Sequence, residues 1–205
     1  ATTSTAPEVV SAMLPFFTEY YGNPSSVYNF AQKSKMAIED AREIIADSIG
    51  AAKSNEIYFT GGGSESDNWA LKSAAFGLRD KGNHIITTKI EHHAILNTCA
   101  YLEKNGFEVT YLDVDSEGFV SLEDVENAIT EKTILISVMF ANNEIGTIEP
   151  VCEIGEIAHK HGILFHTDAV QAMCHVPINV TEMNIDLLSA SAHKFHGPKG
   201  IGFMY

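Results

Sequence analysis

The sequence has few cysteines, few basic residues and no long hydrophobic run, and each shortage argues against a class of protein. Its 205 residues include three cysteines, Cys99, Cys152 and Cys174, which are too scattered for a disulfide framework or a CxxC zinc site. Thirteen basic residues against 27 acidic ones leave no basic stripe, so we expect no nucleic-acid partner. No apolar run could cross a bilayer and no signal peptide opens the chain, so we expect no membrane partner and a cytoplasmic location.

Short strands alternate with helices along most of the chain. Apolar residues predict a helix near residues 7–20, kinked at Pro15, and a second helix over 27–49. The predicted strands are 56–60, 84–88, 107–112, 133–140, 163–167, 185–190 and 201–205. The predicted helices between the strands begin near 68 and then cover 94–105, 122–129 and 154–161. This alternation predicts an α/β fold of three layers, α/β/α, with a mostly parallel central sheet.

A glycine-rich turn, Gly61-Gly62-Gly63-Ser64, lies between the strand 56–60 and the next predicted helix. Free N–H groups and the helix dipole at such a position favour an anion. The turn matches neither the GxxxxGK[ST] phosphate loop nor the dinucleotide GxGxxG motif. The alternative is a turn that only reverses the chain.

Polar side chains follow five of the predicted strands. Because ligands bind beyond the carboxyl ends of parallel strands, we expect these five loops to converge on one site. In chain order they hold Gly63-Ser64, Glu91-His92-His93, Asn142-Asn143-Glu144, Asp168 with Gln171, and Ser191-Ala192-His193-Lys194. Each group has a simpler alternative: Asp168 could cap a helix, the asparagines could form a turn, and Gln171 could be a solvated helix residue.

Lys194 lies between His193 and His196, and neighbours of this kind can depress the pKa of an amine and make it a usable nucleophile. The alternative is a solvated basic turn. An anion cradle, an amine, a carboxylate and an imidazole together suit pyridoxal 5'-phosphate. We predict no metal site, because the sequence has no HExxH motif and neighbours such as Glu91, His92 and His93 rarely face one ion.

Six motifs resemble those of the cysteine desulfurases, which are pyridoxal-phosphate enzymes of fold type I that supply sulfur for iron–sulfur clusters. The motifs are YGNPSS (21–26), FTGGGSESDNWALK (59–72), EHHAIL (91–96), ANNEIGT (141–147), FHTDAVQ (165–171) and SAHKFHGPKGIG (191–202). The resemblance runs from residue 1 to residue 205. It implies that the chain is the cofactor-binding large domain, without the smaller C-terminal domain.

The resemblance also implies a role for each matching residue. Lys194 would hold the cofactor as a Schiff base and later move a proton at the α-carbon of the substrate. Asp168 would pair with the pyridinium nitrogen, and His92 would stack on the ring and take part in acid–base steps. Gln171 would bind the ring hydroxyl, with Asn143 close to it and to the bound amino acid. The phosphate would be held by Gly63, Ser64, Ser191 and His193.

The implied reaction removes sulfur from L-cysteine to give L-alanine and an enzyme persulfide, which passes to a sulfur acceptor or an iron–sulfur scaffold protein. Family members are expected to be homodimers. The nucleophilic cysteine of the family lies beyond residue 205, so Cys99, Cys152 and Cys174 are interpreted as structural, and the fragment alone is expected to be inactive. The alternatives are a selenocysteine lyase, an aminotransferase relative, or a non-catalytic module for dimerisation or partner binding.

Overall fold

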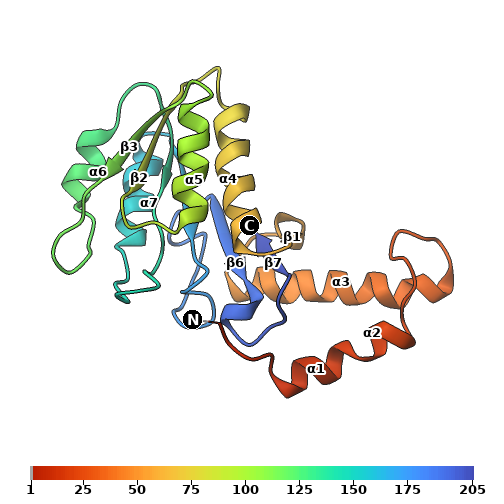
Figure 1. Cartoon of the computed structure of the whole chain (residues 1–205). Coiled ribbons are helices and arrows are strands. Elements are labelled where there is room, and N and C mark those ends of the chain that lie inside the picture. Colours follow the sequence, from red (N-terminus) through yellow and green to blue (C-terminus); the bar gives the residue numbers. More distant parts are fainter. Residues whose placement is uncertain (1) are drawn as a thin grey trace.

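A seven-stranded sheet forms the centre of the computed structural model, which describes residues 2–205 (Figure 1). The strands are β1 (Tyr58–Thr60), β2 (His84–Thr88), β3 (Glu108–Leu112), β4 (Thr133–Ser137), β5 (Leu164–Asp168), β6 (Leu187–Ser191) and β7 (Gly202–Met204). Their order across the sheet is β1-β7-β6-β5-β4-β2-β3. Only β7 is antiparallel to its neighbours, β1 and β6, so the mostly parallel sheet expected from the sequence is confirmed.

Helices cover both faces of this sheet. The α-helices are α1 (Pro7–Met13), α2 (Pro15–Thr18), α3 (Asn29–Ser48), α4 (Gly63–Gly77), α5 (His93–Glu103), α6 (Leu122–Ala128) and α7 (Val151–Lys160). Two 3-10 helices, η1 (Ser54–Glu56) and η2 (Ala192–Lys194), complete the set. Apolar side chains of α4 and α5 pack in one core cluster, and those of α6, α7 and the end of α3 pack in the other. The three layers predicted from the strand and helix alternation are therefore present.

The apolar runs of the strands arise because both faces are covered. In β2 the consecutive side chains Ile85 and Ile86 are fully buried, one in each core cluster, as alternation along a strand requires. A strand that is buried on both faces has a continuously hydrophobic sequence. The apolar runs therefore predicted helices on both faces of the sheet.

Several element boundaries differ from the sequence-based prediction. The strand expected over 133–140 ends at Ser137, although Val138 and Phe140 still donate backbone hydrogen bonds to β5. The helix expected to begin at residue 154 begins at Val151, directly after Pro150, which is the N-cap residue. The predicted kink at Pro15 is present as a break between α1 and α2.

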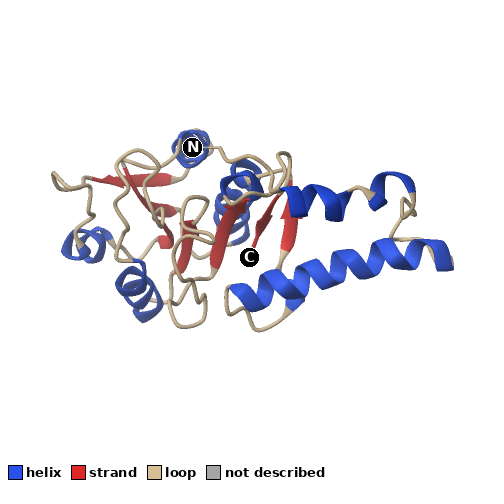
Figure 2. Ribbon diagram, turned by 90° about the horizontal axis from the view of Figure 1, so that it is seen from below, coloured by secondary structure: helices blue, strands red, loops and turns tan. Residues whose placement is uncertain are grey.

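The N-terminal arm, which we define as residues 7–48 with α1, α2 and α3, extends away from the sheet (Figures 1 and 2). Its helix α3 buries only Ala31, Ser34 and Ala46. Large apolar side chains are exposed along the arm, among them Leu14, Phe17, Tyr21, Val27, Tyr28, Phe30, Met36 and Ile44. Among residues 2–205, no helix has both the length and the apolar character that a membrane crossing requires.

We predict that Phe165→Ala destabilises the domain by about 3–5 kcal/mol, because it empties a site in the core next to β5. Phe165 is fully buried and lies on the strand that carries His166 and Asp168. Denaturant unfolding measures the change. Phe17→Ala is the control, since Phe17 is 69% exposed and its loss should change stability by less than about 0.5 kcal/mol. Equal effects of the two substitutions would contradict the assignment of the core.

Candidate active site

A cavity of about 190 Å³ opens at the carboxyl ends of the parallel strands. Its walls come from the loops after β1, β2, β4, β5 and β6, which are the five loops expected to converge. The lining includes all nine residues singled out from the sequence: Gly63, Ser64, His92, Asn143, Asp168, Gln171, Ser191, His193 and Lys194. The structure therefore brings the predicted residues together, while their chemical roles stay predictions.

The N-terminus of α4 forms one wall. Gly62 precedes the helix with a φ of 147°, a backbone conformation that favours glycine. Gly63, the first residue of the helix, lies so close to the loop after β5 that a Cβ atom there would be 2.5 Å from Cγ2 of Val170. The first N–H groups of a helix have no partner within it, and here they begin at a wall of the cavity. This end of α4 can therefore hold an anion.

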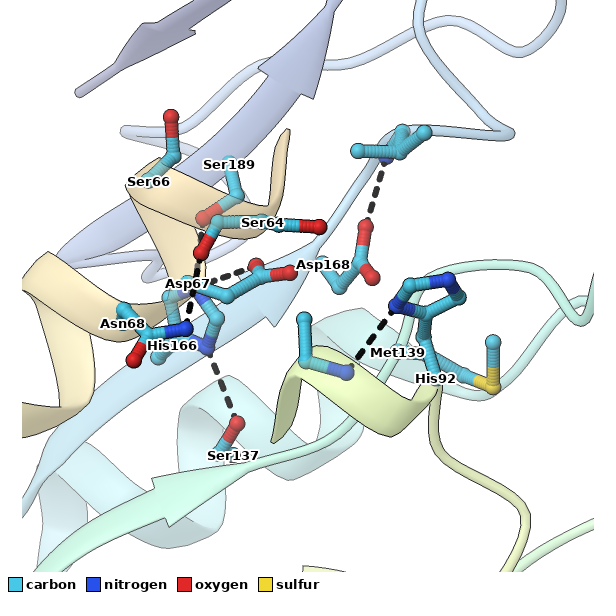
Figure 3. A network of polar contacts seen from close by, with 12 residues as sticks. Ser64, Ser66, Asp67, Asn68, His92, Ser137, Met139, His166, Asp168 and Ser189 are labelled. Carbon is cyan, nitrogen blue, oxygen red and sulfur yellow. Dashed lines mark hydrogen bonds and ion pairs between the residues drawn. The ribbon is translucent and has the colours of Figure 1, made fainter. Parts of the chain in front are cut away.

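The floor of the cavity contains two carboxyl groups, Asp67 from α4 and Asp168 from the end of β5 (Figure 3). Asp168 is buried, and its Oδ1 accepts a 2.9 Å hydrogen bond from the backbone N–H of Val170. Burial raises the pKa of Asp168, whereas that hydrogen bond, His92 and Lys194 lower it. Burial raises the pKa of Asp67 well above its usual range, and the nearby charge of Asp168 raises it further.

His166 lies beneath this floor and does not supply a balancing charge. Its Nδ1 is 2.9 Å from Oγ of Ser137 and its Nε2 is 3.0 Å from Oγ of Ser189. Burial lowers the pKa of His166 to about 3, so the ring is neutral near pH 7. Asp67 lies between His166 and Asp168, with its Oδ1 3.8 Å from Nε2 of His166 (Figure 3). The protonated form of Asp67 is therefore favoured when Asp168 is charged.

His92 lies at the start of α5, where its side chain faces the cavity opposite Asp168 (Figure 3). Its Nδ1 accepts a 3.1 Å hydrogen bond from the backbone N–H of Ala94, so in the neutral ring the proton is on Nε2. The preceding residue, Glu91, is buried and anchors this loop. Its Oε1 accepts from Oγ1 of Thr88 at 2.9 Å and from the backbone N–H of Met139 at 2.8 Å.

The two asparagines after β4 have different tasks. Oδ1 of Asn142 accepts hydrogen bonds from the backbone N–H groups of Glu144 and Ile145, and its amide donates to the carbonyl oxygen of Ile90. Asn142 thus forms the turn that was the alternative interpretation, whereas Asn143 lines the cavity. The alternative interpretation of Asp168 was a helix cap. Its Oδ1 does accept a hydrogen bond from the backbone N–H of Val170, as a cap would, but no helix follows.

Lys194 and His193 reach the cavity from η2, directly after β6. Lys194 is half-buried and lines the same cavity as Asp168, so a lysine and an aspartate share one partly open cavity. Burial and the nearby charges of Lys194 and Lys199 lower the pKa of His193. His193 in its neutral form lies beside Ser191, Ser64 and the start of α4. Together these residues form a set of hydrogen-bonding groups that suits a phosphate.

The family model for aminotransferase class-V matches residues 1–205, which is the whole chain. The chain belongs to the aminotransferase class-V family. It is 66% identical over 205 residues to a "Cysteine desulfurase IscS" of Clostridium botulinum (strain Kyoto / Type A2) and 63% identical to one of Methanosarcina thermophila. The alignments cover 100% of this chain but 51% and 50% of those relatives, so the chain spans about half their length.

Solved structures of family members superpose closely on the whole chain. The structure described as "SspA in complex with cysteine" has a TM-score of 0.96 at 48% identity and aligns over 58% of its own length. The apo cysteine desulfurase from Thermococcus onnurineus NA1 has a TM-score of 0.92 at 35% identity, over 51% of its length. The fold-type I architecture implied by the sequence motifs is therefore confirmed.

Four residues of the cavity were not identified from the sequence: Asp67, Met139, Ala141 and Val170. Asp67 follows Gly63 by four residues in α4 and so shares its helix face, a spacing that could have revealed it. Met139 and Ala141 follow β4, where the rule of strand exits also applies. Their exposure to the cavity depends on where β4 ends, which the apolar run 133–140 concealed.

None of the three cysteines lines the cavity. Cys99 is fully buried in α5, and burial raises the pKa of its thiol to about 12, so it agrees with a structural role. Cys152 and Cys174 are exposed. Their exposure does not support the structural role that the sequence analysis gave to Cys152 and Cys174.

The cavity fits the pyridoxal phosphate expected from the sequence. Carboxylate oxygens of Asp67 and Asp168 and a ring nitrogen of His92 lie within 4.8 Å of one another. A positively charged group bound among them, either a protonated ring nitrogen or a metal ion, would stabilise the charged form of a buried carboxyl. Lys194 and the start of α4, a position that suits an anion, line the same cavity, and pyridoxal phosphate has both an aldehyde for the amine and a phosphate for the helix start.

We predict that Glu91→Gln flattens the pH dependence of stability. Burial raises the pKa of Glu91 from 4.5 to about 8, so the folded state holds a proton that the unfolded chain has lost. The contribution is fully present below about pH 4.5 and is lost as the pH rises through about 8. One pKa unit corresponds to about 1.4 kcal/mol, so the change across this window should amount to several kcal/mol. Urea unfolding at a series of pH values measures the slope.

Glu131→Gln is the matched control, because Glu131 is exposed and its neutralisation should leave the slope unchanged. An unaltered slope in Glu91→Gln would show that this carboxyl ionises normally in the folded protein.

Proposed function

We propose that this chain is the pyridoxal-phosphate-binding large domain of a cysteine desulfurase. The protein would remove sulfur from L-cysteine and leave L-alanine and a cysteine persulfide for iron–sulfur cluster assembly. The observation that carries the proposal is one cavity lined by the Lys194 amine, the Asp168 carboxyl and the N-terminus of α4. The similarity to the named cysteine desulfurases of Clostridium botulinum and Methanosarcina thermophila supports the choice of reaction within the family.

Pyridoxal phosphate supplies, when bound, an electron sink that stabilises negative charge at the α-carbon of an amino acid. The amine of Lys194 would bind the cofactor covalently and, once released by the substrate, accept or return the proton at that carbon. Asp168 would hold a proton on the ring nitrogen, since a buried carboxylate is stabilised by a cationic partner. With Asp67 protonated, the carboxylate of Asp168 would be the only negative charge beside the ring nitrogen.

The remaining residues orient the bound groups. His92 would cover one face of the ring, and in the neutral ring its Nε2–H is available to donate a hydrogen bond to the substrate. Gln171 and Asn143 carry amides that can donate to the ring hydroxyl and to the substrate carboxylate. The phosphate would be held by Gly63, Ser64, Ser191 and His193. A fixed phosphate and a fixed ring nitrogen set the orientation in which Lys194 meets the α-carbon.

Sulfur transfer requires a thiolate that attacks the sulfur atom of the bound substrate and takes it as a persulfide. Desolvation, complete at Cys99 and partial at Cys152 and Cys174, raises the pKa values of the three thiols, and nearby acidic charge raises that of Cys152 further. A raised thiol pKa lowers the thiolate population. The named relatives are about twice as long as this chain. We therefore propose that another part of the full-length protein provides the nucleophilic cysteine.

We propose a cytoplasmic homodimer that delivers sulfur to an acceptor or an iron–sulfur scaffold protein. The proposal rests on the family resemblance. Two observations are compatible with it: the three cysteines are free thiols, and the N-terminal arm has an apolar surface that a second subunit could cover. Sedimentation equilibrium of the full-length protein measures the subunit number.

We predict that the protein with added pyridoxal phosphate shows the visible absorbance of a lysine-bound cofactor, and that Lys194→Ala abolishes it. Lys81→Ala is the control, because Lys81 is exposed and does not line the cavity. The control should keep the band. A protein that stays colourless under saturating cofactor would instead support a non-catalytic interaction module.

We predict that the full-length protein with L-cysteine and a thiol reductant forms alanine and sulfide in equal amounts. Lys194→Ala should lower this rate at least about a hundredfold, since it removes the group that moves the proton at the α-carbon. Selenide released from selenocysteine far faster than sulfide from cysteine would favour a selenocysteine lyase. A keto acid as the main product would favour an aminotransferase.

A further inference from the structure

The N-terminal segment Thr2–Ala6, which we call the strap, is bound to the loop that carries Lys194. In Figure 1 the red segment that leads into α1 starts beside the blue loop that follows β6. The backbone N–H of Thr3 donates to the carbonyl oxygen of His193 at 2.9 Å, and that of Ala6 donates to the carbonyl oxygen of His196 at 3.0 Å. The two segments are more than 180 residues apart, so only the tertiary fold brings them together.

The side chain of Thr3 makes the central contacts. Its hydroxyl donates to the carbonyl oxygen of His193 at 2.9 Å and accepts from the backbone N–H of His196 at 2.8 Å. One hydroxyl therefore bridges the residue before Lys194 and the second residue after it. Thr5 contacts the loop more weakly, with its hydroxyl 3.4 Å from the carbonyl oxygen of Gly197.

The Lys194 loop needs outside support. His196 has a φ of 65°, an unfavourable conformation for a residue with a side chain. The hydroxyl of Thr3 holds the N–H group of that strained residue. On the opposite side, Nε2 of His175 is 3.2 Å from the carbonyl oxygen of Lys194. The carbonyl groups on both sides of the Lys194 backbone are thus held by residues from other parts of the fold.

Holding the backbone matters because Lys194 has a long, flexible side chain. An error of about 1 Å in the position of a reacting group can cost about a hundredfold in rate. A backbone clamp confines the base of that side chain, so fewer orientations of the amine compete with those that enter the cavity.

We propose that Thr3 is a positioning residue for Lys194, whose hydroxyl holds the backbone on both sides of the lysine and so directs the amine into the cavity. This inference rests on the proposed function, in which Lys194 is the amine that binds pyridoxal phosphate.

The test compares Thr3→Val, which removes only the hydroxyl contacts, with Thr3→Ser, which restores a hydroxyl. Thr5→Val is the matched control from the same strap. Two measurements are made on the full-length protein freed of cofactor. The first is hydrogen–deuterium exchange of residues 193–197. The second is the rate at which pyridoxal phosphate with borohydride labels Lys194, followed by peptide mass spectrometry.

Thr3→Val should speed exchange at the His196 amide and slow the labelling of Lys194 about tenfold, as expected for the loss of two hydrogen bonds. Thr3→Ser should behave as wild type in both measurements, and Thr5→Val should remain close to it. Melting temperatures identify any variant that is unfolded. Rescue by serine separates a role of the hydroxyl from a general effect of the segment on stability.

Labelling of Lys194 at the wild-type rate in Thr3→Val would overturn the inference, and so would equal slowing in Thr5→Val. Absence of Lys194 labelling in the wild-type protein would count against the proposed function instead. In that case the exchange measurement alone decides, and unchanged exchange at His196 in Thr3→Val would overturn the claim that its hydroxyl holds the loop.

Discussion

The burial of Asp168 at the end of β5 is the constraint on which the cavity depends. A carboxylate removed from water is costly unless hydrogen bonds or a positive charge compensate it. Among residues 2–205 it receives one hydrogen bond, from Val170, together with the more distant charges of His92 and Lys194. Asp67 adds a second carboxyl, and His166 remains neutral. A cationic group bound at the floor of the cavity would therefore be stabilised, and a pyridinium ring is such a group.

The surrounding structure makes this unfavourable floor possible. Both faces of the sheet are covered by helices, and the strands next to β5 are buried on both faces. Ser137 and Ser189 satisfy both ring nitrogens of His166 from the neighbouring strands β4 and β6. A rigid, hydrogen-bonded layer thus lies beneath Asp67 and Asp168, so that their carboxyl groups remain close together. Holding two carboxyl groups close together costs free energy, and the hydrophobic core offsets this cost, as is common at functional sites.

The walls above this floor come from segments far apart in the chain. Glu91 links the loop after β2 to the loop after β4, and Asn142 links the same two loops through the carbonyl oxygen of Ile90. The strap links the beginning of the chain to the loop after β6. The first two contacts hold the loops of His92 and Asn143 together, and the strap holds the Lys194 loop to the beginning of the chain. The site is thus a property of the assembled sheet end rather than of any motif.

The sequence by itself determined the layered fold and most, but not all, of the residues that line the cavity. Alternating apolar runs identified the buried sheet, and the polar residues that follow the strands identified the five loops of the cavity, because parallel strands end at one edge. The resemblance to the cysteine desulfurases then selected the nine residues of those loops that line it. Local pattern could not show that β4 ends at Ser137, because Val138 and Phe140 remain buried and hydrogen-bonded beyond it.

Only the tertiary structure decided which polar groups are buried together and which backbone segments are held by long-range hydrogen bonds. The raised pKa values of Asp67 and Glu91 arise from burial, and burial depends on what packs around a residue rather than on its neighbours in sequence. The contact of Thr3 with the Lys194 loop is likewise invisible in the sequence, since it joins residues 190 positions apart. Periodicity and strand exits are local signals, whereas desolvation and long-range hydrogen bonds exist only after the chain has folded.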